Sequence, residues 1–323
     1  MPNQPQTLAS DITFEQWRHS GYYFRYAQYD IFYRYHLNLD SEKPNLLLLH
    51  GSPTASMDWH KVWGSLSQHF NLITLDFLGY GSSDKPKNHN YTIMEQANLC
   101  EFLMQKLKLT QCSVIAHDYG ATVLQELLAR QNTHQLNITI NQAVILNSGI
   151  FIEGNQPMLI QRLMIGPLFS LIGALNNRWM FRIGWQRLFY HTLSTDAFNE
   201  VWRMICYKQG RSLLPKLQRY LFERLEYRDR WRNALIHAQQ PLLYICGDFS
   251  PVSGEATRKY YERHMPHQRT IALNVGHYPH LEAPDLVVSH SVAFLNTPTR
   301  LCCMRAQTIC CNRFRRIPRL KTW

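Results

Sequence analysis

Short, uninterrupted apolar runs alternate along the chain with longer segments whose apolar residues recur at helical spacing. Residues 44–50 are such a run and predict a strand buried on both faces, and residues 70–76 and 140–146 predict further strands. Residues 92–109 have helical spacing and predict a helix just before a further β-branched run, residues 112–115. Strands that alternate with helices predict a doubly wound, mostly parallel sheet.

The alternation is interrupted once. Residues 21–37, rich in aromatic and β-branched residues, predict a pair of strands ahead of the first buried run. From residue 150 to about 240 the pattern is only helical, and strands and helices then alternate again. We therefore predict a core of residues 1–149 and 241–297, with a helical cap of residues 150–240 inserted after the sixth strand. Residues 298–323, rich in arginine and cysteine, are predicted to form a disordered tail.

The segment around Asp118 is the centre of the predicted chemistry. The β-branched run is followed by Ala116, His117, Asp118, Tyr119 and Gly120, and helical spacing begins directly afterwards. Small residues on both sides of the acid, between strand and helix, are typical of a nucleophile elbow in which aspartate replaces serine. The positive end of the helix would stabilise the aspartate as an anion. The same pattern also fits an aspartate that caps a helix in an unrelated α/β protein.

An aspartate nucleophile favours different chemistry from a serine. A carboxylate that attacks saturated carbon gives an alkyl ester, which water can then cleave at the carbonyl of the aspartate. A serine attacking the same carbon would leave an ether that cannot be hydrolysed in this way. Asp118 therefore indicates cleavage of a carbon–oxygen or carbon–halogen bond.

Polar clusters fall where predicted strands end, at the edge of a parallel sheet that forms the ligand crevice. They are His50-Gly51-Ser52-Pro53, Asp118, Gly247-Asp248-Phe249-Ser250 and residues 276–284, which include His277. In this order they predict an α/β-hydrolase fold. A dinucleotide fingerprint at Gly79-x-Gly81 is rejected, because Asp84 stands where the third glycine belongs.

Four segments carry a resemblance to a known family: residues 47–54, 75–86, 117–120 and 277–284. The chain resembles the α/β-hydrolase superfamily, in the branch that holds epoxide hydrolases and haloalkane dehalogenases. It is similar there to the mesoderm-specific transcript proteins and their bacterial relatives, from about residue 14 to about residue 296.

The resemblance implies a role for each motif residue. Asp118 would be the nucleophile, and His277 would activate the water that hydrolyses the ester. Backbone N–H groups of Ser52 and Tyr119 would form the oxyanion hole. The remaining motif positions are His50, Gly51, Pro53, His117 and Gly120. The reaction needs no metal and no organic cofactor.

The acid that would orient His277 is an open question. Similar enzymes have a Gly-x-x-Asp pattern after the seventh strand, whereas this chain has Ser250 at the acid position and Asp248 two residues earlier. Asp248 would orient His277 from a shifted loop, or it is a solvated turn residue. In some relatives the acid follows the sixth strand, where this chain has Asn147, with Glu153 shortly beyond.

The residues available to bind or protonate a leaving group bear on which function the chain has. Similar dehalogenases hold the halide with a Trp after the nucleophile and an Asn or Trp elsewhere. This chain has Tyr119 after Asp118 and Ser52 after His50-Gly51, which disfavours a dehalogenase. Epoxide opening needs a proton donor, and the predicted cap offers four tyrosines: Tyr190, Tyr207, Tyr220 and Tyr227. The leading prediction is an epoxide hydrolase-like enzyme acting on a small apolar electrophile. The alternatives are a catalytically silent binding protein, suggested by Ser250, and a haloalkane dehalogenase.

Composition adds limits on partners and location. The net charge of +11 comes mainly from the predicted cap and tail, and no nucleic-acid motif accompanies it, so we predict solvated faces and no nucleic-acid partner.

The N-terminus lacks a signal-peptide pattern, and the most apolar stretch, residues 163–175, is too short to span a bilayer. Cysteines in apolar segments favour a reducing cytoplasm. The tail cysteines, next to basic residues, leave metal binding or acylation with membrane contact open. The oligomeric state is not predicted.

Overall fold

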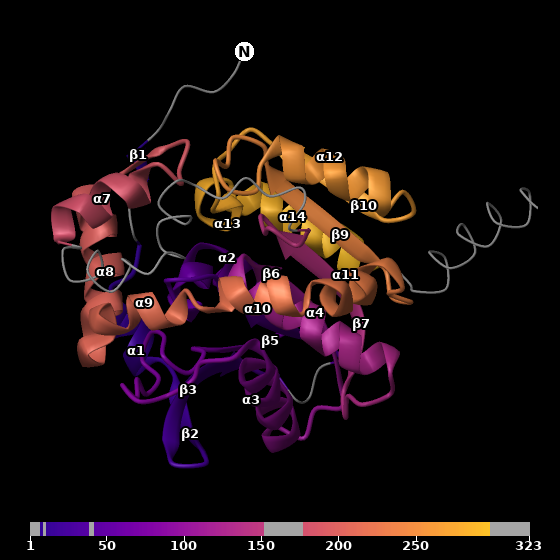
Figure 1. Ribbon diagram of the computed structural model, residues 1–323, viewed down its shortest axis with the longest axis horizontal. Coiled ribbons are helices and arrows are strands. Elements are labelled where there is room, and N and C mark those ends of the chain that lie inside the picture. The colour runs from indigo at the N-terminus through magenta and orange to yellow at the C-terminus, as the bar shows by residue number, and fades with distance from the viewer. Residues whose placement is uncertain (1–6, 9–10, 39–41, 152–176, 298–323) are drawn as a thin grey trace, which may run out of the picture.

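The fold is built on an eight-stranded sheet (Figure 1). The computed structural model describes residues 7–8, 11–38, 42–151 and 177–297. The strand order is β10-β9-β7-β6-β4-β5-β3-β2. The strand β3 pairs antiparallel with β2 and β5, and all other neighbours are parallel. The strands are β2 (Tyr22–Tyr26), β3 (Tyr29–His36), β4 (Asn45–Leu49), β5 (Asn71–Leu75), β6 (Gln111–His117), β7 (Thr139–Leu146), β9 (Leu242–Gly247) and β10 (Arg269–Leu273). The predicted mostly parallel sheet is confirmed.

Helices cover both faces of this sheet. One face packs against α3 (Ile93–Lys106), α4 (Tyr119–Asn132) and α12 (Glu255–His264). The other packs against α2 (His60–Ser67) and α14 (Pro284–Leu295), with α1 (Phe14–His19) alongside. The short helices η1 (Ser56–Trp59) and α13 (Pro279–Glu282) lie in loops between these layers.

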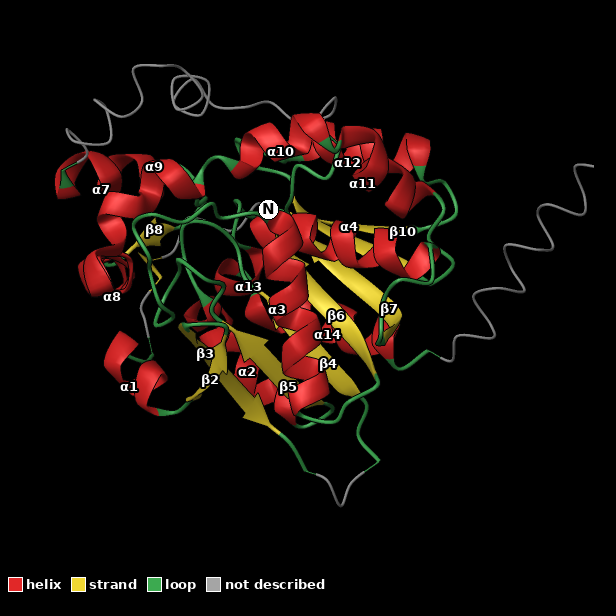
Figure 2. Ribbon diagram, turned by 60° about the horizontal axis from the view of Figure 1, so that its bottom comes forward, coloured by secondary structure: helices red, strands yellow, loops and turns green. Residues whose placement is uncertain are grey.

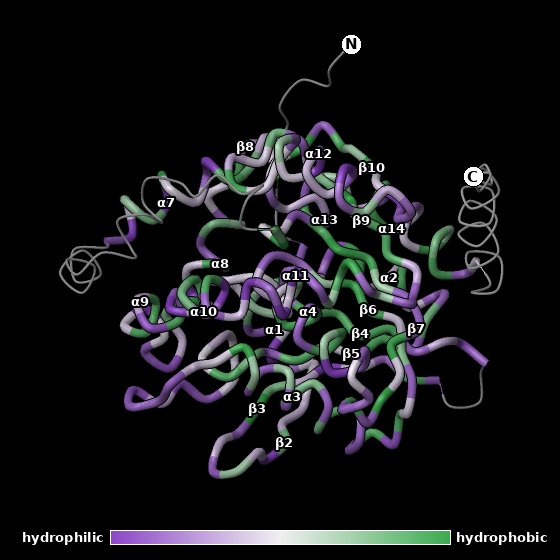
Figure 3. Tube along the Cα trace, turned by 45° about the vertical axis from the view of Figure 1, so that its right-hand side comes forward, coloured by the Kyte–Doolittle hydropathy of each residue, from purple (hydrophilic) through white to green (hydrophobic). Residues whose placement is uncertain are grey.

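The central strands have no polar face, as Figure 3 shows by their hydrophobic colour. Along β4 the residues from Leu46 to Leu49 are fully buried, and successive side chains enter the two opposite cores. Each such leucine contributes roughly 1.5–3 kcal/mol by leaving water. This two-sided burial explains why the strand appears in the sequence as a continuous apolar run.

The segment inserted after β7 contributes the helices that we call the cap helices: α7 (Arg178–Gln186), α8 (Thr195–Cys206), η3 (Tyr207–Leu213), α9 (Leu214–Leu217), α10 (Tyr220–Glu226) and α11 (Arg228–Ile236). Figure 2 shows α7, α9 and α10 together at one end of the molecule. The expectation of an insert with only helices is wrong in one place. The strand β8 (Thr192–Leu193) pairs in parallel with β1 (Thr7–Leu8).

Several sequence predictions fall outside the described residues: Glu153, the apolar stretch 163–175 and the tail 298–323. Within the part of the chain that the structure describes, no helix combines the length and the apolar character needed to cross a bilayer. The four cysteines of the described residues, Cys100, Cys112, Cys206 and Cys246, form no disulfide.

Candidate active site

The turn between β6 and α4 has the geometry of a nucleophile elbow. Asp118 adopts φ 45° and ψ −107°, a conformation that residues with a side chain rarely adopt and that functional sites tend to retain. A Cβ added to Gly120 would lie 2.4 Å from the carbonyl oxygen of Leu49, so only glycine lets α4 start this close to β4. The small residue after the acid is therefore required by packing.

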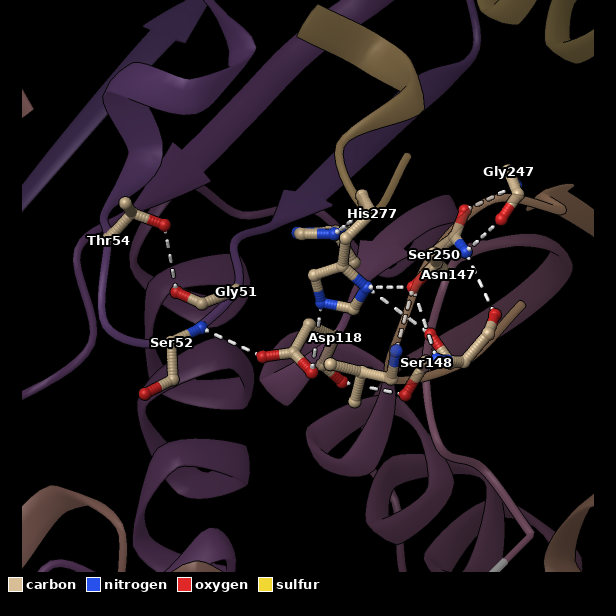
Figure 4. Close-up of polar contacts among 12 residues, drawn as sticks. Gly51, Ser52, Thr54, Asp118, Asn147, Ser148, Gly247, Ser250 and His277 are labelled. Atoms are coloured by element: carbon tan, nitrogen blue, oxygen red, sulfur yellow. Dashed lines mark hydrogen bonds and ion pairs between the residues drawn. The ribbon is translucent and has the colours of Figure 1, made fainter. Parts of the chain in front are cut away.

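The Asp118 carboxylate is held between two loops (Figure 4). The Ser52 N–H donates to Oδ2 at 3.2 Å, and Nε2 of His277 lies 3.7 Å from Oδ1. Burial alone would raise the pKa of Asp118, but the contact with His277 outweighs it, with help from His117 and Ser52, and lowers the pKa to about 2. The side chain is an anion at neutral pH, as a nucleophile must be.

The imidazole of His277 is supported by hydroxyl groups. Its Nδ1 lies 3.1 Å from Oγ of Ser250 and 3.3 Å from Oγ of Ser253. Among the described residues, the only carboxylate within 4.0 Å of a His277 ring nitrogen is that of Asp118. The backbone N–H of His277 donates to the carbonyl of Leu188 at 2.6 Å, which fixes the loop from the cap side.

The prediction that Asp248 orients His277 is corrected by the structure. Both carboxylate oxygens of Asp248 accept from Arg258, at 2.9 and 2.7 Å. Asn147 lies near this region, but its side chain donates to the carbonyls of Gly247 and Ser253 and accepts the Gly247 N–H. It therefore positions the serine loop rather than the imidazole.

The two serines have different hydrogen-bonding capacity. Ser250 Oγ accepts backbone N–H groups from Val252 and Ser253, which occupies both of its lone pairs and leaves its O–H to donate to His277 Nδ1. Ser253 Oγ has no other hydrogen-bond partner among the described residues and can accept from a protonated Nδ1. Ser253 is therefore the group able to support an imidazolium, and no spacing in the sequence pointed to it.

The other predicted motif residues hold the loops around the carboxylate. His50 donates from Nδ1 to the Gly51 carbonyl at 2.8 Å and accepts the Phe77 N–H at Nε2, and burial lowers its pKa to about 4. His117 donates from Nε2 to the His277 carbonyl at 2.9 Å, and burial lowers its pKa to about 3. Both imidazoles are neutral at pH 7. The Ser52–Pro53 peptide bond is cis.

Of the two expected oxyanion donors, the structure shows one in contact with the carboxylate. The Ser52 N–H donates to Oδ2 of Asp118. Tyr119 is the first residue of α4, where backbone N–H groups lack partners within the helix, so its N–H is available as a donor. The role of Tyr119 in an oxyanion hole stays a prediction.

Polar groups from the cap and from the loop after β5 reach the opposite side of the site. Oγ of Ser52 accepts from Tyr80 O–H at 3.4 Å and from Gln218 Nε2 at 3.2 Å. The ring of Tyr220 packs edge-on against Tyr119, with the centroids 4.9 Å apart. Burial, then the nearby Asp118 charge, raises the pKa of Tyr220, so its phenol stays protonated.

Of the four cap tyrosines considered from the sequence, the structure places one at the site. Tyr220 lies at the site, whereas Tyr207 packs on Phe14, Tyr227 on Trp231 and Tyr190 on Phe249. Gln218 and Tyr80 were not predicted. Tyr80 lies in the Gly79-x-Gly81 loop, one of the segments that carried the resemblance, whereas Gln218 is brought in only by the tertiary fold.

Comparisons with known proteins agree with this architecture. A family model described as alpha/beta hydrolase fold matches residues 44–284. The mesoderm-specific transcript homolog protein of Bos taurus is 34% identical over 292 residues, which cover 87% of each chain. The putative hydrolase LipZ of Mycobacterium tuberculosis (strain ATCC 25618 / H37Rv) is 32% identical over 283 residues, 87% of this chain and 97% of that protein.

Solved structures give the same fold. The haloalkane dehalogenase DbeA from Bradyrhizobium elkani USDA94 superposes with a TM-score of 0.73 at 20% identity, over 85% of this chain and 97% of that one. An alpha/beta hydrolase fold protein from Burkholderia ambifaria has a TM-score of 0.70 at 18% identity, over 84% and 96%. At such identities these structures bear on fold alone. The strained elbow on β6, the sheet order and the matching family model together lead to one conclusion: the chain belongs to the α/β-hydrolase family.

Proposed function

We propose that this protein hydrolyses a small apolar epoxide through a covalent ester on Asp118. The observation that carries the proposal is the setting of the Asp118 carboxylate: a low pKa, one oxygen on the Ser52 N–H and the other facing His277. A carboxylate in this setting is suited to attack saturated carbon.

The first step opens the epoxide ring. Oδ2 occupies the oxyanion position, so Oδ1 is the oxygen left to attack a ring carbon. The new carbon–oxygen bond forms as the carbon–oxygen bond of the ring breaks, and its electron pair moves to the epoxide oxygen. The protonated phenol of Tyr220 supplies a proton to that oxygen.

The second step cleaves the ester. In the tautomer that carries its hydrogen on Nδ1 and donates it to Ser253 Oγ, His277 takes a proton from water at Nε2, and the water oxygen attacks the Asp118 carbonyl carbon. The tetrahedral oxyanion forms at Oδ2, next to the N–H groups of Ser52 and Tyr119. When the ester bond breaks, the diol leaves with the former Oδ1, and the proton returns through His277 to the leaving oxygen. The acid form of Asp118 then restores the Tyr220 proton.

The serine support of His277 favours a slow second step. A neutral hydroxyl stabilises an imidazolium less than a carboxylate does, and a neutral partner can cost about 10⁴-fold in a serine protease. The first step uses no proton transfer to His277, so it is less affected. We expect the ester to accumulate during turnover.

The assay that tests this function uses a panel of small apolar epoxides and measures diol formation, with haloalkanes and halide release in parallel. We expect diol from at least one epoxide and none from Asp118→Ala. The matched control is Asp248→Asn, because Asp248 pairs with Arg258 and should not affect turnover. Halide release without diol would instead favour the dehalogenase, and turnover unaffected by Asp118→Ala would contradict the mechanism.

A further inference from the structure

Three buried side chains converge behind the elbow, apart from the groups that act on substrate. They are Asp58 of η1, His117 at the end of β6 and His280 of α13, with exposed fractions of 4%, 0% and 0%. One ligand atom of each lies within 4.8 Å of the others. Three segments distant in sequence therefore bring a carboxylate and two imidazoles to one point in the interior.

Three of the four imidazole nitrogens at this point lack a hydrogen-bond partner among the described residues. Nε2 of His117 must carry its hydrogen, because it bonds to the carbonyl of His277, so Nδ1 presents a lone pair. The three nitrogens without a partner in the described part of the chain are that Nδ1 and both ring nitrogens of His280. Buried polar atoms in folded proteins are nearly always satisfied, so three unpaired nitrogens in one cluster indicate a missing ligand.

We propose that Asp58, His117 and His280 bind a divalent transition-metal ion of the Zn²⁺ class. Two imidazole nitrogens and one carboxylate oxygen are a donor set that Zn²⁺ takes, with a fourth position left for water. The tautomer of His117 is the one that metal-bound histidines have, because its second nitrogen donates to a backbone carbonyl.

Charge and access are consistent with a cation. Asp58 accepts a hydrogen bond from Thr54 but has no cationic partner among the described residues. A divalent ion would supply the positive charge that this buried carboxylate lacks. Asp58 and His60 also border an apolar cavity between η1 and the cap helices α7 and α8, which provides a path inward.

The ion would act on His277 indirectly. His117 holds the His277 carbonyl, and His280 lies three residues after His277 on the same loop. The sequence prediction that the reaction needs no metal still applies to the chemistry itself, because the proposed ion touches no reacting atom. Its role is to fix the loop that carries the imidazole.

The test uses the full chain, stripped with EDTA, dialysed and reloaded with Zn²⁺ or Co²⁺. Affinity is measured by competition with a chromophoric chelator, stoichiometry by elemental analysis, and geometry by the visible absorption of bound Co²⁺. The variants are Asp58→Asn and His280→Gln, which change the ligand atoms with little change in volume. The control is His237→Gln, an exposed histidine at the end of α11.

We expect one tightly bound equivalent in the wild type and in His237→Gln, with a Co²⁺ spectrum of low coordination number. The affinity should fall at least about 10-fold in each ligand variant. Circular dichroism checks that the variants are folded, and the rise in melting temperature on adding Zn²⁺ should be absent from them. The proposal would be overturned if the wild type bound neither ion, or if Asp58→Asn and His280→Gln bound the ions as tightly as the wild type.

Discussion

At the scale of single residues, the groups next to Nδ1 of His277 bear most directly on the proposed rate of ester hydrolysis. Ser250 and Ser253 present hydroxyl oxygens to Nδ1, while the nearby Asp248 is fully engaged by Arg258. The sequence showed that an acid was missing at position 250, but not where the remaining acid would go. Arg258 lies ten residues after Asp248, and local spacing in the sequence does not predict which cation an aspartate will pair with.

Restoring a carboxylate at this place should accelerate ester hydrolysis. Ser250→Asp would put a charge near Nδ1 of His277, stabilise the imidazolium and raise the rate of the second step by up to about 10³–10⁴-fold. The rate is read from the decay of the covalent ester in quenched single-turnover samples. Ser250→Asn, equal in size and uncharged, is the control, and equal decay rates in the two variants would refute the role given to the missing charge.

At the scale of elements, the strands and helices of the core are predictable from the sequence. Each lies in one kind of surroundings along its length, and these surroundings leave a regular pattern of apolar and polar residues. The strand β4 is buried on both faces, and the helix α3 is capped by Thr92, whose side chain accepts the Glu95 N–H, so both are predictable. The pair β1–β8 is not, because two residues carry no period, and only the tertiary fold brings Leu8 next to Leu193.

The contact between α4 and α11 depends on one buried acid. Glu126 accepts from Arg130, Arg230 and the indole N–H of Trp231. Its removal would leave Arg230 without its ion-pair partner, whereas Arg130 would keep its contact with Glu101. Because Arg230 is partly exposed, we expect a loss of about 3 kcal/mol, at the low end for a broken buried pair. Glu126→Ala tests this by urea unfolding at pH 7.

The control is Glu255→Ala, which removes an ion pair of the same i,i+4 spacing on the exposed face of α12 and should cost no more than about 1 kcal/mol. Burial raises the pKa of Glu126, but the bonds from Arg230, Trp231 and Arg130 outweigh it and lower the pKa below 4.5. Its stabilisation is therefore present above pH 4.5 and is lost as the pH falls through the folded pKa. Equal losses in both variants at pH 7 would contradict this account.

At the scale of the whole molecule, the site lies where the sheet meets the cap helices. Gln218 bonds to Ser52, Tyr220 packs on Tyr119, and the carbonyl of Leu188 accepts from His277. The positions of Asp118 and His277, the proposed nucleophile and base, were predictable because both residues lie in strand-end motifs. The cap contacts were not, because helical pattern alone does not say which face of a helix will meet which loop.

The central claim is that Asp118 forms a covalent ester that His277 then hydrolyses. The most direct measurement is the intact mass of His277→Gln after mixing with epoxides and haloalkanes, since loss of the base should trap the ester. An epoxide should add its full mass, whereas a haloalkane should add its mass less that of the hydrogen halide. The account predicts an epoxide adduct that disappears when Asp118→Ala is added to the same variant. An adduct that persists without Asp118, or none from any epoxide, would contradict it.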